Sequence, residues 1–118
     1  MLNHQLIRDF FDSVNRQDLP SMGRILTEDA VFYFPKTRPL LGRERIIRFF
    51  SVLFRRFPEL SFSIQRIIVE SPHAAVHWRN RGKSRKNALY ENEGVTVLEG
   101  REGGICFISD FFKDTERF

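Results

Sequence analysis

The feature that most constrains the fold is a change in the spacing of apolar residues near Pro58. Before this proline, apolar side chains recur every three or four residues, which is the period of a helix with one buried face. After it, apolar and polar residues alternate, which is the period of a half-buried strand. Helical segments followed by a series of strands predict an α+β domain in which the helices pack on one face of an antiparallel sheet.

The first half of the chain predicts three helices and one strand. The first helix spans about residues 3 to 16, and a short second helix spans about 18 to 26 with Pro20 in its first turn. A strand follows at 30 to 35, and a loop then extends to residue 41. The third helix begins after Gly42, ends at Pro58 and has the longest apolar stripe: Ile46, Ile47, Phe50, Leu53, Phe54 and Phe57.

The second half predicts four long strands joined by short turns, over residues 60 to 70, 73 to 81, 88 to 99 and 104 to 112. In the first of them, the apolar positions change parity between Ile64 and Ile67. This change predicts a β-bulge that bends the sheet. Neither a linker nor a repeat interrupts the pattern, so we expect one domain over residues 1 to 118.

The composition favours an apolar interior. The chain has 13 Phe residues against one Trp and two Tyr, and phenyl rings supply large apolar surfaces without a polar group. Two interpretations remain open: the rings surround an apolar cavity, or they only fill a small core.

The net charge of +4 includes a dense basic run between Arg79 and Lys86, where we expect the tip of a hairpin. A nucleic-acid-binding face combines basic residues with aromatic ones, whereas Asn, Gly and Ser separate the charges here. We therefore expect a solvated loop and no nucleic-acid partner.

Metal, cofactor and membrane classes have little support in the sequence. Cys106 is the single cysteine, which excludes an intrachain disulfide and a cysteine cluster, and the three histidines have no metal-ligand spacing with carboxylates. The chain has no apolar run near the ~18 residues of a membrane span and no signal-peptide pattern. We expect a cytoplasmic protein without a cofactor.

The strongest candidate for chemistry is Asp110, a carboxylate among bulky apolar residues near the end of the last strand. Burial in apolar surroundings disfavours the ionised form and raises the pKa of a carboxyl group, which suits a general base. The alternative is that Asp110 bonds to an Arg or Tyr neighbour and only closes the end of the strand.

Alternation along the strands suggests which other side chains line a pocket. Trp78 and Asn80 share the inward face of their strand, and Tyr90 and Asn92 share that of the next. A phenol or amide there could polarise a carbonyl oxygen, or could be satisfied locally at a pocket rim. The predicted ligand-binding set is Trp78, Asn80, Tyr90, Asn92, Tyr33 and Phe112, with Asp110 as the predicted catalytic residue.

Four motifs occur in an order that resembles the nuclear-transport-factor-2-like superfamily, and its SnoaL-like branch in particular. They are Asp29-Ala30-Val31-Phe32, Gly42-Arg43-Glu44, Tyr90-Glu91-Asn92-Glu93-Gly94-Val95, and Gly104-Ile105 leading to Asp110-Phe111-Phe112. The resemblance implies a cone-shaped fold, in which a strongly curved antiparallel sheet wraps three N-terminal helices around a deep apolar pocket. It also implies homodimers that pair through the sheet.

The same resemblance leaves the chemistry open, because the superfamily includes cyclases, isomerases, epoxide hydrolases and pure binding modules. Asp110 matches the aspartate that the SnoaL-like and epoxide hydrolase branches carry on the last strand. The carboxylates of ketosteroid isomerases are missing at Phe34 and Val95, so we reject that activity. Where epoxide hydrolases carry an arginine and a second aspartate, this chain has Trp78 and Asn80.

Three hypotheses follow. The first is a SnoaL-like protein that binds a small apolar molecule and acts as a cofactor-independent cyclase or isomerase, with Asp110 removing a proton next to a carbonyl. The second is a non-catalytic ligand-binding or dimerisation module. The third is an epoxide hydrolase in which Tyr33 and Asn80 assist Asp110.

Overall fold

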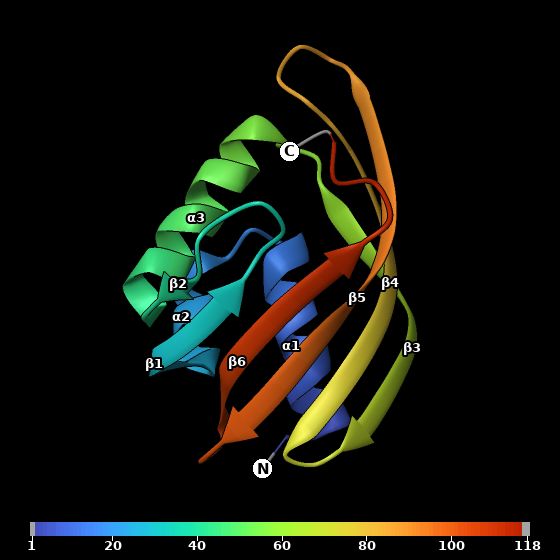
Figure 1. Ribbon diagram of the computed structural model, residues 1–118. Helices are drawn as coiled ribbons and strands as arrows, with labels where there is room; N and C mark the ends of the chain where they lie inside the picture. The colour runs from blue at the N-terminus through green and yellow to red at the C-terminus, as the bar shows by residue number, and fades with distance from the viewer. Residues whose placement is uncertain (1, 117–118) are drawn as a thin grey trace.

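Three helices lie against one face of a curved sheet in the computed structural model, which describes residues 2–116 (Figure 1). The sheet has six strands in the order β2-β1-β6-β5-β4-β3. The elements are α1 (His4–Asn15), α2 (Leu19–Ile25), β1 (Leu26–Tyr33), β2 (Leu40–Leu41), α3 (Arg43–Arg56), β3 (Ser61–Glu70), β4 (His73–Lys83), β5 (Leu89–Arg101) and β6 (Gly104–Phe112). None of the helices in this part of the chain has the length and apolarity of a membrane span.

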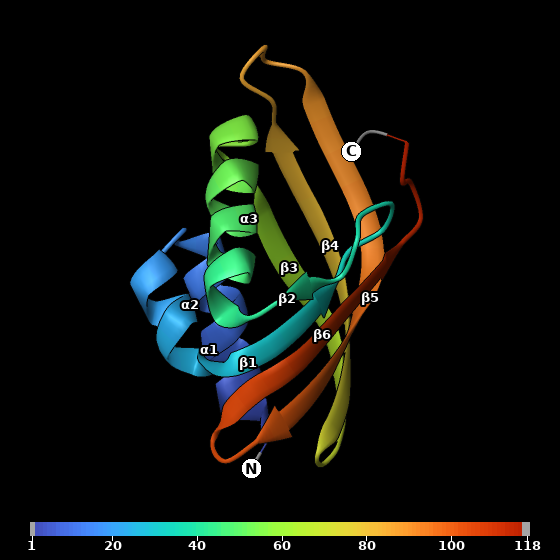
Figure 2. The ribbon, with the colours of Figure 1, turned by 60° about the vertical axis from the view of Figure 1, so that its left-hand side comes forward.

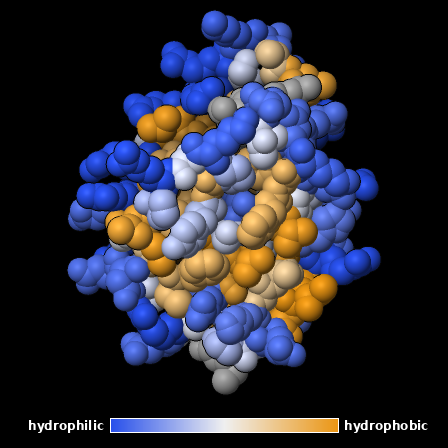
Figure 3. All heavy atoms as spheres, in the orientation of Figure 1, coloured by the Kyte–Doolittle hydropathy of each residue, from blue (hydrophilic) through white to orange (hydrophobic). Residues whose placement is uncertain are grey.

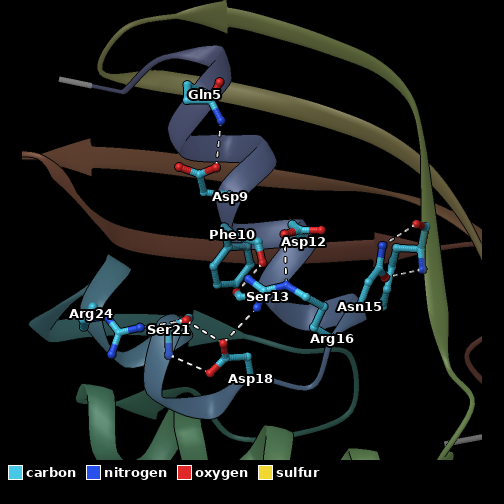
Figure 4. A network of polar contacts seen from close by, with 11 residues as sticks. Gln5, Asp9, Phe10, Asp12, Ser13, Asn15, Arg16, Asp18, Ser21 and Arg24 are labelled. Atoms are coloured by element: carbon cyan, nitrogen blue, oxygen red, sulfur yellow. Dashed lines mark hydrogen bonds and ion pairs between the residues drawn. The ribbon is translucent and has the colours of Figure 1, made fainter.

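Polar side chains define where α1 and α2 begin. The Asn3 side chain accepts a hydrogen bond from the backbone N–H of Leu6 at 2.8 Å, and Asp18 accepts one from Ser21 at 3.1 Å. These are N-caps that satisfy backbone donors without an intrahelical partner. Arg16 also joins Asp12 and Asp18, each at 3.0 Å, on the solvent side of the corner between the two helices (Figure 4).

The third helix begins without a side-chain cap. Gly42 has a φ of 97°, a conformation that glycine adopts without steric cost, and its N–H donates to the carbonyl oxygen of Ala30 at 2.8 Å. This bond ties the start of α3 to β1. The side chains that α3 buries against the sheet are Ile46, Phe50, Leu53 and Phe54.

The sheet is mixed rather than wholly antiparallel. β1 and β6 run parallel, with Tyr33 opposite Ser109, while every other neighbouring pair is antiparallel. After the meander of β3 to β5, β6 begins beside the start of β1, so the two strands run in the same direction. Alternation of apolar residues specifies the faces of a strand but not the direction of its neighbour, so the sequence could not reveal this pairing.

The predicted bulge is confirmed, because the β3–β4 register shifts between Ile64 and Arg66. A second shift between Glu99 and Gly100 in β5 was not predicted. β1 starts at Leu26, directly after α2 and earlier than expected, and the expected loop contains the short β2. Figure 2 shows the resulting curvature, with the concave face of the sheet turned toward the helices.

The core lies between the concave face, α1 and α3, and phenyl rings dominate it. Phe32 of β1 stacks on Phe50 of α3 with a centroid separation of 5.5 Å and an interplanar angle of 1°. Phe49 and Phe10 meet the ring of Phe50 edge-on at 5.6 and 6.4 Å. Such ring pairs add to the stabilisation from apolar burial, and they form the surroundings of the one carboxylate on the concave face of β6.

Candidate functional site

Asp110 lies on the concave face of β6, directly opposite Thr96 of β5. Its Oδ1 accepts a hydrogen bond from the Thr96 hydroxyl at 2.6 Å, and Thr96 Oγ1 accepts one from Trp78 Nε1 at 2.8 Å. An indole N–H can only donate, so the hydroxyl proton of Thr96 is directed to Asp110. Three adjacent strands therefore hold one chain of hydrogen bonds with a fixed polarity.

A glycine allows this chain to form. Gly94 of β5 is paired with Trp78 on one side and with Phe112 on the other. A Cβ atom at Gly94 would lie 2.8 Å from Trp78 Cζ2 and 2.7 Å from Phe112 Cβ, closer than real Cβ atoms approach. The missing side chain lets the indole lie across β5 and reach Thr96 two residues along the strand.

The surroundings of Asp110 change its acidity. Burial raises the pKa of its carboxyl group to about 7, and the hydrogen bond from Thr96 opposes this increase. Among residues 2–116, no Arg, Lys or Tyr side chain hydrogen-bonds to it, so the expected alternative of an Arg or Tyr partner is not what the structure shows. Near neutral pH both protonation states are populated, as acid–base catalysis requires.

A small cavity lies beside Asp110. Its volume is about 20 Å³, which is room for about one water molecule. The Oδ2 atom has no hydrogen-bond partner within the described residues. The deep pocket implied by the resemblance is therefore not shown, because phenyl rings fill that space. The lining residues are Phe10, Phe11, Val14, Phe32, Phe50, Phe62, Thr96, Ile108 and Asp110.

Trp78 and Asn80 face the concave side, as alternation predicts, with exposed fractions of 2% and 7%. Trp78 joins the hydrogen-bond chain to Asp110. Asn80 lies two residues further along β4, and its Oδ1 is buried without a hydrogen-bond partner in the described part of the chain. A buried acceptor of this kind costs about 1–3 kcal/mol of stability.

Tyr90 and Asn92 make their contacts with Phe57 and with the segment after β6. The Tyr90 ring packs against Phe57 at 5.2 Å, and its hydroxyl accepts a hydrogen bond from Asn92 Nδ2 at 2.7 Å. Asn92 also bonds to the backbone of Asp114 at 2.8 and 3.1 Å, which ties the segment after β6 to β5. Asn92 lies four residues from Thr96, or about 13 Å along the strand, so the structure does not bring this pair to Asp110.

Tyr33 and Phe112 lie on opposite faces of the sheet. Tyr33 is 44% exposed on the convex face, where its ring contacts Phe107 at 5.6 Å. It does not line the small inner cavity, but it lines an open surface hollow together with Asp110 and Phe112. Phe112 lies on the concave face, with ring contacts to Phe34 at 5.3 Å and to Trp78 at 6.2 Å.

Thr96 is the functional residue that sequence reasoning missed. A signal was present, because Thr96 continues the alternation of Asn92 and Gly94 onto the concave face. What the sequence could not show is the register that places it opposite Asp110. For metals, no group of three or more His, Cys, Asp or Glu in residues 2–116 could hold an ion.

Solved structures share this architecture over almost all of the chain. A candidate SnoaL-like polyketide cyclase from Jannaschia sp. CCS1 has a TM-score of 0.84 and 21% identity, covering 92% of this chain and 83% of its own. A nuclear-transport-factor-2-like protein from Anabaena variabilis ATCC 29413 has a TM-score of 0.83 and 22% identity, with coverages of 94% and 86%.

A protein with a ketosteroid isomerase-like fold from Catenulispora acidiphila DSM 44928, solved in complex with trimethylamine, has a TM-score of 0.85 and 12% identity, covering 93% and 86% of the two chains. Identities this low establish the fold and not the activity. A comparison with curated protein sequences gave no significant match.

The family itself is shown by the sequence. Residues 7–108, which include α1 through most of β6, match the family of SnoaL-like domains. The three helices and the curved sheet agree with that match. The chain belongs to the SnoaL-like domain family.

Proposed function

We propose that this protein is a cofactor-independent enzyme of the cyclase or isomerase type, which removes a proton next to a carbonyl group of a small apolar substrate. Asp110 is its general base. The observation that carries the proposal is a carboxyl group with a pKa of about 7 beside a cavity lined by phenyl rings. A base is most effective when its pKa lies near the working pH.

The hydrogen bonds around Asp110 assign a role to each of its oxygen atoms. Thr96 holds Oδ1 at 2.6 Å, and Oδ2 is left to accept the proton from carbon. The carboxylic acid that results returns this proton, either to another carbon in an isomerisation or to the alkoxide formed when the enolate attacks a second carbonyl in a cyclisation. Trp78 fixes the orientation of Thr96 and acts as a positioning residue.

The cavity lining also restricts the substrate. Thr96 is its only polar side chain besides Asp110, and its proton is already committed. Without another donor to stabilise a developing oxyanion, the substrate must itself have an acidic C–H bond, such as that between two carbonyl groups. A substrate larger than one water molecule enters the inner cavity of about 20 Å³ only if the surrounding rings move, but Asp110 also lines a larger, open hollow with Tyr33 and Phe112.

A tautomerisation assay tests this proposal directly. The enol form of 1-phenylbutane-1,3-dione absorbs strongly in the ultraviolet, so its conversion to the diketone after dilution into buffer can be followed in time. We expect the protein to accelerate this proton transfer and Asp110→Asn to abolish the acceleration. Asp9→Asn makes the same chemical change on the exposed side of α1 and should retain it. Full acceleration by Asp110→Asn would refute the assignment.

The second candidate is a binding module without catalysis, and the small cavity with a single carboxylate favours it. Native mass spectrometry followed by denaturing extraction distinguishes the two. A co-purifying apolar molecule without an acidic C–H bond, together with no acceleration of tautomerisation, would support the module. A bound dicarbonyl compound would support the enzyme.

We further propose that a second copy of the chain covers the convex face of the sheet. Figure 3 shows apolar side chains gathered across this face, and contiguous exposed apolar surface is characteristic of interfaces. Tyr33, Ile68 and Phe111 are 44%, 60% and 60% exposed there, and Leu41 of β2 is 58% exposed. An isologous pair of such faces would form a symmetric homodimer.

Sedimentation velocity tests the homodimer. The wild-type protein should sediment as a dimer and Phe111→Lys as a monomer, because a charge would be buried at the interface. Val52→Lys introduces the same charge at an exposed apolar position of α3, away from the convex face, and should remain dimeric. A monomeric wild-type protein would contradict the proposal.

A further inference from the structure

A second hollow lies between α3 and the loop that joins β1 to β2. Its volume is about 140 Å³, several times that of the cavity at Asp110. One side comes from residues 34–37, which follow the end of β1, and the other comes from α3. The lining residues are Phe34, Pro35, Lys36, Thr37, Phe49, Val52, Leu53 and Arg56.

The walls of this hollow are apolar and aromatic. The rings of Phe34 and Phe49 are 4.8 Å apart at 56°, and Val52 beside them is 43% exposed. In another protein, an engineered cavity of about 150 Å³ with apolar walls binds one benzene molecule. The hollow therefore has the size and surface that suit one benzene-type ring.

A cation stands at the rim. Arg56 belongs to the last turn of α3, its guanidinium lies 5.9 Å from the centre of the Phe57 ring, and no carboxylate pairs with it among residues 2–116. Lys36, the other lining cation, already pairs with Glu116 at 3.1 Å. Arg56 is thus the lining group that remains available to an incoming anion.

The basic run at the β4–β5 tip adds to the charge of this end of the molecule. The backbone N–H of Arg85 donates to the carbonyl oxygen of Arg56 at 3.1 Å, which holds the tip against the end of α3 (Figure 1). The run contains five basic residues between Arg79 and Lys86. Clustered charges of one sign attract ligands of the opposite sign, so an anionic group is favoured at the rim.

We propose that this hollow binds a monocyclic aromatic carboxylate, with its ring between Phe34, Phe49 and Val52 and its carboxylate on the guanidinium of Arg56. A planar guanidinium can bind a carboxylate through two parallel hydrogen bonds, and the aromatic walls hold the ring beside it. This site goes beyond the proposed function, because none of its lining residues lines the inner cavity at Asp110.

One layer of rings separates the two sites. Phe34 and Phe49 contact Phe32 at 5.8 and 5.3 Å, and Phe32 stacks on Phe50, which lines the inner cavity. A ligand in the outer hollow lies on the other side of this layer from the inner cavity at Asp110. Its binding and the chemistry at Asp110 can therefore be tested independently.

An NMR titration of the full chain with sodium benzoate tests the site. Saturable shifts are expected in the backbone amides of Phe34, Lys36 and Thr37 and of residues 49–56. Benzyl alcohol has the ring without the charge and acetate the charge without the ring, so both should bind more weakly. Arg56→Gln should raise the dissociation constant for benzoate about tenfold, the effect of losing a charge-assisted hydrogen bond. Arg55→Gln removes the same charge from the next residue, which does not line the hollow, and should bind as wild type does.

A second variant fills the hollow without altering its charge. Val52→Trp places a large side chain at a half-exposed position and should abolish the shifts while the rest of the spectrum is retained. Three results would each overturn the proposal. Arg56→Gln and Arg55→Gln could bind benzoate equally, or the wild type could bind benzyl alcohol and benzoate with equal affinity. The third is a set of chemical shift changes centred on Thr96 and Asp110. Asp110→Asn should bind benzoate normally, so failure here is distinct from failure of the proposed catalysis.

Discussion

Two carboxylates on neighbouring strands show how strongly the two faces of this sheet differ. Asp110 faces the helices, and burial raises its pKa to about 7. Glu93 of β5 faces outwards, where the Lys113 ammonium lies 2.8 Å from Oε1 and the His77 ring 2.5 Å from Oε2. Hydrogen bonds from Lys113 and His77, with the charge of Arg79, lower the Glu93 pKa to about 2.

The difference comes from the partners and not from the residue type. Glu93 is surrounded by cations, so its carboxylate stays ionised across the physiological pH range. It therefore carries a fixed negative charge and does not exchange a proton. Asp110 has a hydroxyl partner and apolar neighbours, so it exchanges a proton near neutral pH. A perturbed pKa of either direction marks an unusual environment, but only the upward shift provides a base for proton transfer.

Asp110→Asn should have the largest effect on stability. The folded pKa of about 7 lies above the ordinary value of 3.8 for an aspartate, so the folded state binds this proton more tightly than the unfolded state. Wild-type stability then falls as the pH rises from about 4 to 7. Asparagine does not ionise, so the variant should be more stable than wild type by about 4 kcal/mol at pH 8. Urea unfolding at pH 8 and pH 4 measures this difference, which should largely disappear at the lower pH.

Thr96→Val tests the hydrogen-bond chain on the concave face. The substitution keeps the shape of the side chain but leaves the buried Trp78 N–H without an acceptor, which should destabilise the fold by about 2 kcal/mol. It also removes the bond that lowers the Asp110 pKa, so that pKa should rise further. Denaturant unfolding and NMR titration of Asp110 measure the two effects. Thr37→Val, at an exposed loop position, should change neither.

The Asn80→Leu substitution tests whether Asn80 is a buried polar group without a hydrogen-bond partner on the concave face. Replacing a buried, unsatisfied Oδ1 by an apolar side chain of similar size should stabilise the fold by about 1 kcal/mol. Asn92→Leu is the matched control, because its amide is fully engaged and its loss should destabilise. Thermal unfolding of both variants measures these changes in stability. If Asn80→Leu is less stable than wild type, the Asn80 side chain has a hydrogen-bond partner in solution.

Glu93→Gln should have the smallest effect and the opposite dependence on pH. The folded pKa of about 2 lies below the ordinary value of 4.5 for a glutamate, so ionised Glu93 stabilises the fold at neutral pH. This contribution is lost as the pH falls from about 4.5 through 2. The variant should be slightly less stable than wild type at pH 7 and equal to it near pH 2. If the stability difference between Glu93→Gln and wild type grew as the pH fell, the proposed contrast between Glu93 and Asp110 would be wrong.

The elements with strong local patterns could be predicted from the sequence. The helical stripe before Pro58 gave α3 nearly its observed bounds, and the change of parity between Ile64 and Ile67 gave the bulge in β3. Alternation also placed Trp78 and Asn80 on the concave face. These properties depend on residues near one another in the chain, which is why a single sequence contains them.

Properties that depend on distant segments could not be predicted. The parallel pairing of β1 with β6 and the register that joins Thr96 to Asp110 are set by the packing of the whole sheet. The cavity volume depends on how rings from α1, β1 and α3 fill the space between them. For Tyr33 the face could be predicted, because it alternates with the buried Phe32 along β1.

The position of β6 has a consequence for how the chain folds. This strand follows all the others in the sequence, yet it lies between β1 and β5. Tyr33 and Ser109 are paired across more than half of the 118-residue chain, and non-local pairings of this kind slow folding. Until β6 is inserted, β1 and β5 each expose an unpaired edge that invites aggregation. Completion of the sheet during synthesis therefore depends on the same strand that carries Asp110.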